Sequence, residues 1–402
     1  MRKYIILGDF NKKYFIILTL LLITGYIEYF LIYYIDKITN YQNKIRTNKL
    51  LTSTLIYIGQ FLCFIPLIIN KICNCKKSSI TTKNNKSSSK IKYIFNNSNN
   101  LINFNDKILI IIICILLLVN DIINILILYL IKIANIVNNQ EFYFMEYLFL
   151  FLISKYLFKL NYYKHQYYSI IFIFLFGLLK YLSKLYGEGN LKDKYKEVIL
   201  VLLLQIMQAF IDSYTIGNIK LLMESKYLSP YLICSTFGLI NGLITIISYF
   251  IVSYFPCNHN LCDLEKIYFD NIYSVFDNLT SIEILLLIYT IFQSGVYQIL
   301  VYIMINDFTV CHIFLFYQML EFTDSFIEIF SSSNINLFVV CILIISGIFE
   351  IFIVLIFLEI IELGFCGLNY NTKRNIKKRA LIESSLSNEI RNLTEETVTA
   401  DE

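Results

Sequence analysis

Apolar stretches of about twenty residues recur along the whole chain, and they limit what it can fold into. A hydrocarbon core about 30 Å thick needs roughly 20 apolar residues of helix to cross it. The sequence contains such stretches at 14–35, 50–69, 108–131, 142–160, 167–185, 197–219, 231–255, 282–305, 310–330 and 337–360. It therefore predicts an all-α, polytopic membrane protein with ten transmembrane helices.

The composition excludes several classes of soluble protein. Of the 402 residues, 57% are hydrophobic and 16% are charged, whereas a soluble domain has about 25% charged residues. The mean hydropathy of +0.62 leaves too few polar side chains to cover two or three soluble domains. A soluble enzyme, a disordered protein and a nucleic-acid binder are excluded, and membrane lipids are the expected surroundings.

Lysine and arginine are divided unequally between the two sets of connecting segments. Ten spans place both termini on one side, and the segments on that side hold 21 Lys and Arg, against 9 on the other. Cytoplasmic loops carry the excess of these residues, so the N-terminus (1–13) and the tail (361–402) are predicted to be cytoplasmic. The tail is expected to be largely disordered, and the Lys-, Ser- and Asn-rich loop 70–107 is interpreted as a cytoplasmic linker.

The outward loop 256–281 contains two cysteines, Cys257 and Cys262, five residues apart. A disulfide between them fits an oxidising compartment, and two free thiols fit the sequence equally well.

Five spans in each half predict an inverted repeat, because an odd number of spans inserts the halves 14–185 and 197–360 in opposite directions. This arrangement is common in transporters, with the substrate site near the midplane between the repeats. Glu28 is the fifteenth residue of the first span and Asp212 the sixteenth of the sixth. These two acids at matching depth support the two-repeat prediction.

Two segments resemble a known family. The segment 153–168, followed by a helix with Gly177, resembles the junction of the fourth and fifth helices in the drug/metabolite transporter superfamily. The segment 205–230, continuing to Gly238 and Gly242, is similar to the sixth helix and the turn after it in the nucleotide-sugar-transporter-like branch. The resemblance implies a ten-helix transporter fold with helices 5 and 10 outside the substrate cavity. Glu350 in span 10 is therefore expected to be a packing or dimer-interface group. An endomembrane location of the Golgi, endoplasmic reticulum or vacuole type is also implied, with the plasma membrane as the alternative.

Polar side chains inside the predicted spans are the candidate site. A charge at the bilayer centre costs about 2.5–3.5 kcal/mol on insertion scales, so such groups face the bundle interior. The residues expected to line a cavity that binds substrate or protons are Glu28, Asp121, Asn124, Gln208, Asp212, Gln318, Glu321 and Asp324. The alternative for each is a hydrogen bond that holds helices together.

Span 9 carries the densest group of acids. Glu321, Asp324 and Glu328 fall within about a 60° arc at 100° per residue, with Gln318 one turn earlier. One interpretation is a water-filled vestibule in which Glu321, the deepest, binds a cationic substrate or a coupling proton. The other is that Asp324 and Glu328 lie beyond the membrane.

The sequence shows no catalytic signature and no cofactor or metal motif. The H-E-x-x-H pattern of zinc proteases is absent, and Cys73 and Cys75 have no second pair at a zinc-binding spacing. We expect a secondary transporter for a small polar or charged metabolite rather than an enzyme. The acidic spans favour cations, amines or proton-coupled solutes. The alternative is a non-transporting multipass protein that acts as an anchor or assembly partner, and a homodimer is compatible with either function.

The charge asymmetry makes a topology prediction. A glycosylation site engineered beyond residue 385 should stay unmodified, whereas one in the middle of loop 256–281 should be modified, because only the latter is predicted to face the lumen. The shift in electrophoretic mobility after glycosidase treatment measures both. The reverse pattern would invert every loop assignment.

Overall fold

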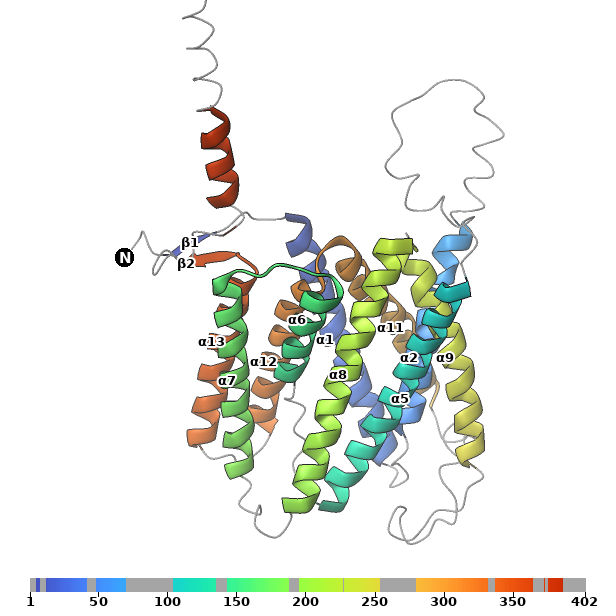
Figure 1. Cartoon of the computed structure of the whole chain (residues 1–402). Coiled ribbons are helices and arrows are strands. Elements are labelled where there is room, and N and C mark those ends of the chain that lie inside the picture. The colour runs from blue at the N-terminus through green and yellow to red at the C-terminus, as the bar shows by residue number, and fades with distance from the viewer. Residues whose placement is uncertain are drawn as a thin grey trace, which may run out of the picture.

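The computed structural model is a bundle of helices that lie side by side (Figure 1). It describes residues 5–7, 12–41, 48–69, 104–134, 143–187, 195–226, 228–253, 280–331, 337–363, 372 and 375–385. The long helices are α1 (Lys12–Tyr41), α2 (Asn48–Leu62), α5 (Phe104–Ala134), α6 (Tyr143–Leu157), α7 (Lys164–Gly187), α8 (Tyr195–Lys226), α9 (Pro230–Ser253), α11 (Ser281–Asp307), α12 (Ile313–Ser331) and α13 (Leu337–Phe357).

Each apolar stretch of the sequence is helical, and eight of the helices are long and apolar enough to cross a membrane. The described chain is thus a multipass helical membrane protein. Two helices fall short of this length: α6 has 15 residues, and the apolar part of α12 with the turn before it covers Val310–Thr323.

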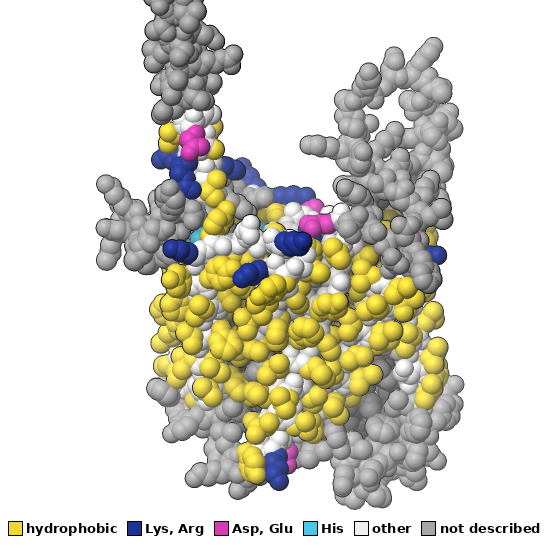
Figure 2. Space-filling view, in the orientation of Figure 1, with side chains coloured by type: hydrophobic (Ala, Val, Ile, Leu, Met, Phe, Trp, Pro, Cys, Tyr) yellow, Lys and Arg dark blue, Asp and Glu magenta, His cyan; other side chains and the backbone are white. Residues whose placement is uncertain are grey.

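The outer surface of the bundle is apolar, as lipid requires. On the face drawn in Figure 2, hydrophobic side chains cover most of the described surface, and Lys and Arg gather mostly at the end near the two short strands. Large apolar side chains such as Ile16, Leu203 and Leu285 are more than half exposed on α1, α8 and α11. Apolar side chains lie outside and several charged side chains lie inside, as described below. This arrangement is the reverse of that in a soluble protein.

The two ends of the chain meet at one end of the bundle. Strand β1 (Ile5–Leu7) pairs antiparallel with β2 (Ile361–Leu363), with Ile6 opposite Glu362. The tail also contains a helix over 375–385. The described part of the tail is therefore more ordered than the sequence predicts. The reason is that β2 satisfies its backbone hydrogen bonds with a segment more than 350 residues away, a pairing that local composition does not reveal.

Helix α2 lies between α9 and α11 at very short range. A Cβ atom on Gly238 of α9 would lie 2.3 Å from the Phe61 nitrogen and 2.6 Å from the Tyr57 carbonyl oxygen of α2. A Cβ atom on Gly59 of α2 would lie 2.3 Å from the Ile291 carbonyl oxygen of α11. Small residues at these crossings let the helix backbones touch, which is how helices pack where no hydrophobic effect drives association.

The crossing of α2 and α9 makes a stability prediction. Gly238→Ala should lower the free energy of unfolding by about 1–3 kcal/mol, as overpacking does, because the added methyl meets backbone atoms that cannot move alone. Gly242→Ala, one turn further on, is the matched control, since its Cβ would lie 3.5 Å from the Tyr57 Cβ atom, an ordinary contact. Thermal unfolding of the purified protein in nanodiscs compares the two. Equal loss of stability would contradict the close approach.

Candidate functional site

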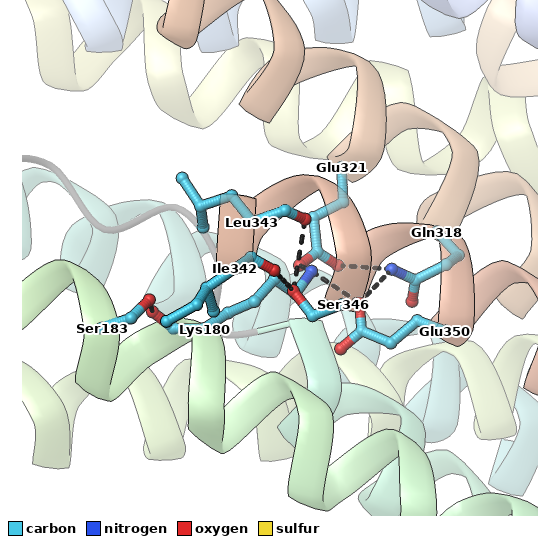
Figure 3. Close-up of polar contacts among 8 residues, drawn as sticks. All are labelled: Lys180, Ser183, Gln318, Glu321, Ile342, Leu343, Ser346 and Glu350. Atoms are coloured by element: carbon cyan, nitrogen blue, oxygen red, sulfur yellow. Dashed lines mark hydrogen bonds and ion pairs between the residues drawn. The ribbon is translucent and has the colours of Figure 1, made fainter. Parts of the chain in front are cut away.

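A buried cluster of charged side chains joins α7, α12 and α13 (Figure 3). The Lys180 ammonium of α7 lies 2.5 Å from the Glu321 carboxylate of α12 and 2.6 Å from the Glu350 carboxylate of α13. Lys180 and Glu350 are 1% exposed and Glu321 is 3% exposed. These three residues, together with Gln318, are called the Lys180 cluster below.

Gln318 connects the two carboxylates. Its side-chain nitrogen donates to Glu350 Oε2 at 2.7 Å and reaches Glu321 Oε2 at 3.5 Å. Gln318 lies one turn before Glu321 on α12, so both face α13, as the spacing of three residues requires. Its side-chain oxygen is buried and has no hydrogen-bond partner among the described residues.

The charges of the Lys180 cluster do not balance. Two ionised carboxylates and one ammonium leave one negative charge in a region closed to water. An uncompensated buried charge is expensive, and a buried ion pair is worth keeping only when its geometry is good. With both carboxylates ionised, the described side chains of the cluster therefore carry one net negative charge.

A second polar group lies on α2, α5, α6 and α8. The Tyr57 hydroxyl donates to Asp121 at 2.8 Å, and the Asn120 amide donates to Asp212 at 2.7 Å. Asp212 also shares a hydrogen bond with the Glu146 carboxyl of α6. A carboxylate can only accept, so a hydrogen bond between two carboxyls requires one of them to carry a proton.

Glu146 of α6 is close enough to Glu321 of α12 for their carboxyls to interact electrostatically, so the second polar group lies next to the Lys180 cluster. Ionisable side chains therefore follow one another through the bundle interior from Tyr57 on α2 to Glu350 on α13. Glu28 stands apart on α1, 5% exposed, next to Ser294 of α11.

The structure brings some of the predicted site residues together and separates others. Gln318 and Glu321 share one cluster, and Asp121 and Asp212 belong to the second polar group. Asn124 and Gln208 are half-buried on α5 and α8. The side chains of Asp324 and Glu328 lie outside the part of the chain that is described. The same holds for both residues of the possible disulfide, Cys257 and Cys262. In the described part, no three His, Cys, Asp or Glu side chains are arranged to hold a metal ion.

The Lys180 cluster bears on two expectations. Of the two roles expected for Glu350, the structure shows packing within the chain, because its carboxylate is buried against Lys180. The membrane-embedded charges are also not all acidic, since Lys180 lies among them. Sequence reasoning missed Lys180 and Glu146. The signal for Lys180 was present, as the first of two lysines, Lys180 and Lys184, inside the stretch 167–185. Glu146 lies near the start of its stretch and looked like a boundary residue.

The Lys180 cluster makes a second stability prediction. Lys180→Met should destabilise the protein by about 3–5 kcal/mol, the cost of breaking a buried ion pair on one side. Adding Glu321→Gln and Glu350→Gln to the same chain should recover most of the loss, because no unpaired charge is left. Lys196→Met is the control, since Lys196 is exposed at the start of α8. Unfolding in detergent measures all three, and a triple variant no more stable than Lys180→Met would contradict this account.

Comparison with known proteins adds no relative. No family model matches this chain, and no curated protein is similar to it. The resemblance to the drug/metabolite transporter superfamily therefore stays a prediction based on the two segments quoted above. What the protein does has to be inferred from its buried polar groups.

Proposed function

We propose that this chain is a secondary transporter that moves a small polar or charged metabolite across a membrane by alternating access. The observation that carries the proposal is the run of buried and half-buried ionisable side chains that connects helices from both halves of the chain. Lys180 and Glu146 belong to the first half, and their partners Glu321, Glu350 and Asp212 belong to the second. Ionisable residues inside a membrane are costly, and they mark substrate, ion and proton pathways.

The packing of the helices supports a two-repeat organisation. Counted in chain order, α1, α2, α5, α6 and α7 form one set of five helices, and α8, α9, α11, α12 and α13 form the other. When each helix is exchanged for its counterpart, the contact of α5 with α8 becomes that of α11 with α1, and the contact of α6 with α7 becomes that of α12 with α13; all four exist. The pairs α2–α9 and α7–α13 map onto themselves, and both are closely packed. Ten spans in two inverted repeats explain this pattern.

Two polar contacts also correspond under this exchange. Asp212 of α8 pairs with Asn120 of α5, and Glu28 of α1 lies next to Ser294 of α11. Asn120 and Ser294 are each the thirteenth residue of their apolar stretch. An acid on the first helix of each repeat thus faces a polar residue at the same depth on the third helix of the other repeat.

The chemistry of the interior favours a cationic or proton-coupled solute. A nucleotide-sugar needs cationic partners for its phosphates, but the Lys180 ammonium is already bound to two carboxylates. Glu28, Asp121, Glu146 and Asp212 add further acidic groups. Cations, amines and solutes that move with protons match this interior better than anions do.

The orientation follows from the basic end of the bundle. The described Lys and Arg side chains gather mostly at the end that carries β1 and β2 (Figure 2). We assign this end to the cytoplasm by the positive-inside rule, which places both termini there. The resemblance favours an endomembrane over the plasma membrane.

A pair of buried thiols offers a test of alternating access. The Cys234 thiol of α9 lies 3.6 Å from the Cys63 sulfur of α2. The two helices are counterparts in the two halves and are in close contact. Both cysteines lie in the halves of their helices nearest the proposed cytoplasmic end, where α2 and α9 have to separate for the site to open inward.

The transport prediction uses purified protein in liposomes and a panel of labelled amines, cations and polar metabolites, with and without a proton gradient. At least one solute should accumulate, and a membrane-permeable thiol oxidant should stop its uptake by cross-linking Cys63 to Cys234. A reductant should restore uptake. Cys234→Ser is the matched control and should be insensitive to the oxidant. Folded protein that moves no solute would favour the anchor or assembly function, and oxidant-treated protein that transports normally would contradict movement of α2 against α9.

A further inference from the structure

We propose that the Lys180 cluster is the site at which this transporter binds and releases its coupling proton. The Gln318 amide hydrogen-bonds to the cluster in both charge states, as a donor to ionised carboxylates and as an acceptor from a protonated one. The inference deepens the proposed function and rests on it for the direction of proton movement. Proton binding itself is a property of the cluster that can be measured without any transported solute.

The cluster is closed to water, and its side chains come from three helices, α7, α12 and α13. Gln318 is fully buried, and the other three side chains are at most 3% exposed. Helix α13 packs against both α7 and α12. A change in charge at the cluster therefore acts on the contacts among these three helices, of which α7 belongs to the first half of the chain and α12 and α13 to the second.

Charge counting identifies the ligand as a single monovalent cation. One ammonium compensates one of the two carboxylates, and the remaining negative charge needs one positive charge in the same space. The Lys180 ammonium already lies 2.5 Å from the Glu321 carboxylate and 2.6 Å from the Glu350 carboxylate. A proton fits this space, because it adds to a carboxylate oxygen without requiring a coordination shell.

The amide of Gln318 can serve both states of the cluster. With both carboxylates ionised, its nitrogen donates to them, as the structure has it. With one carboxyl protonated, the new O–H is a donor and needs an acceptor. The side-chain oxygen of Gln318 is buried and without a partner among the described residues. Rotation of the amide by about half a turn presents this oxygen to the carboxylic acid.

The surroundings supply acids and phenols. The titratable side chains that α1, α6 and α11 bring against α12 are Tyr26, Glu146, Tyr147 and Tyr297, and α7 carries Tyr181 next to Lys180. Glu146 faces Glu321 electrostatically, whereas the Tyr26 hydroxyl bonds to the Met319 carbonyl and to Thr323. Glu146 therefore adds negative charge and strengthens the demand for a proton at the cluster.

The proposed step involves one O–H bond. A proton from water on one side of the membrane adds to a carboxylate oxygen of Glu321 or Glu350, and Lys180 keeps its own proton and stays paired with the other carboxylate. Release to the opposite side breaks the same O–H bond. No electrons are transferred, and each cycle moves one proton.

Infrared difference spectroscopy between low and high pH tests this step on the purified full chain in nanodiscs. The wild-type protein should show the C=O band of a protonated carboxylic acid that disappears at high pH. Glu321→Gln and Glu350→Gln should each lose this band, because each leaves one ammonium and one carboxylate in balance. Gln318→Leu should keep the band but shift its frequency, since the acid loses its acceptor. Glu224→Gln, which removes a half-exposed acid at the end of α8, should leave the band unchanged.

Two results would overturn the proposal. One is that every pH-dependent band survives in both Glu321→Gln and Glu350→Gln and is lost in Glu146→Gln, which would place the only titrating proton on the Glu146–Asp212 pair. The other is the absence of any pH-dependent band in the folded wild-type protein. The two proposals can fail separately. If either of these results is found while uptake persists, the proposed function still stands and only the proton site is wrong. If the expected band is found without uptake, the proton site still stands and the proposed function is wrong.

In liposomes, Glu321→Gln should abolish the pH dependence of uptake, whereas Glu328→Gln, about 10 Å further along the helix axis, should have a milder effect.

Discussion

The cost of placing unpaired charge in a region without water governs how α7, α12 and α13 are assembled on one side of this bundle. Lys180, Glu321 and Glu350 are tolerable inside the membrane only because α7, α12 and α13 bring them within ion-pair distance. If the helices were apart, each of these three charges would be isolated in the membrane, at about 2.5–3.5 kcal/mol apiece on insertion scales. Their association removes much of that cost at once. The contact of α13 with α7 and α12 is thus an electrostatic requirement as well as a packing arrangement.

The other side of the bundle is held by a different means. Helix α2 approaches α9 and α11 so closely at Gly238 and Gly59 that backbone meets backbone, and dispersion replaces ion pairing as the main attraction. Between these two regions, the Asp212–Glu146 contact joins α8 to α6. A polar interior therefore lies between the charge pairs around α13 and the close backbone packing around α2. A protein that opens this interior alternately to two sides has to move one region against the other.

Hydropathy was a reliable guide to the helices because the membrane imposes a length on each one. Every apolar stretch became a helix, with bounds a few residues from those expected. Helical periodicity also placed Gln318 and Glu321 correctly on one face. It did not identify their partners, so the choice between packing and a dimer interface for Glu350 stayed open. The short strand pair of Ile5–Leu7 with Ile361–Leu363 was likewise invisible, since it depends on segments at opposite ends of the chain.

The sequence by itself determined that this protein is a multipass helical membrane protein and that several acids lie inside its apolar stretches. Both properties are local: they depend on the polarity of about twenty consecutive residues and on a period of 3.6. Only the tertiary structure decided that Lys180 neutralises part of the acidic charge, that Gln318 bridges two carboxylates, and that Glu146 connects the two polar groups. These pairings depend on which helices become neighbours. That choice is made by summed packing and charge compensation over the whole bundle, and no single segment encodes it.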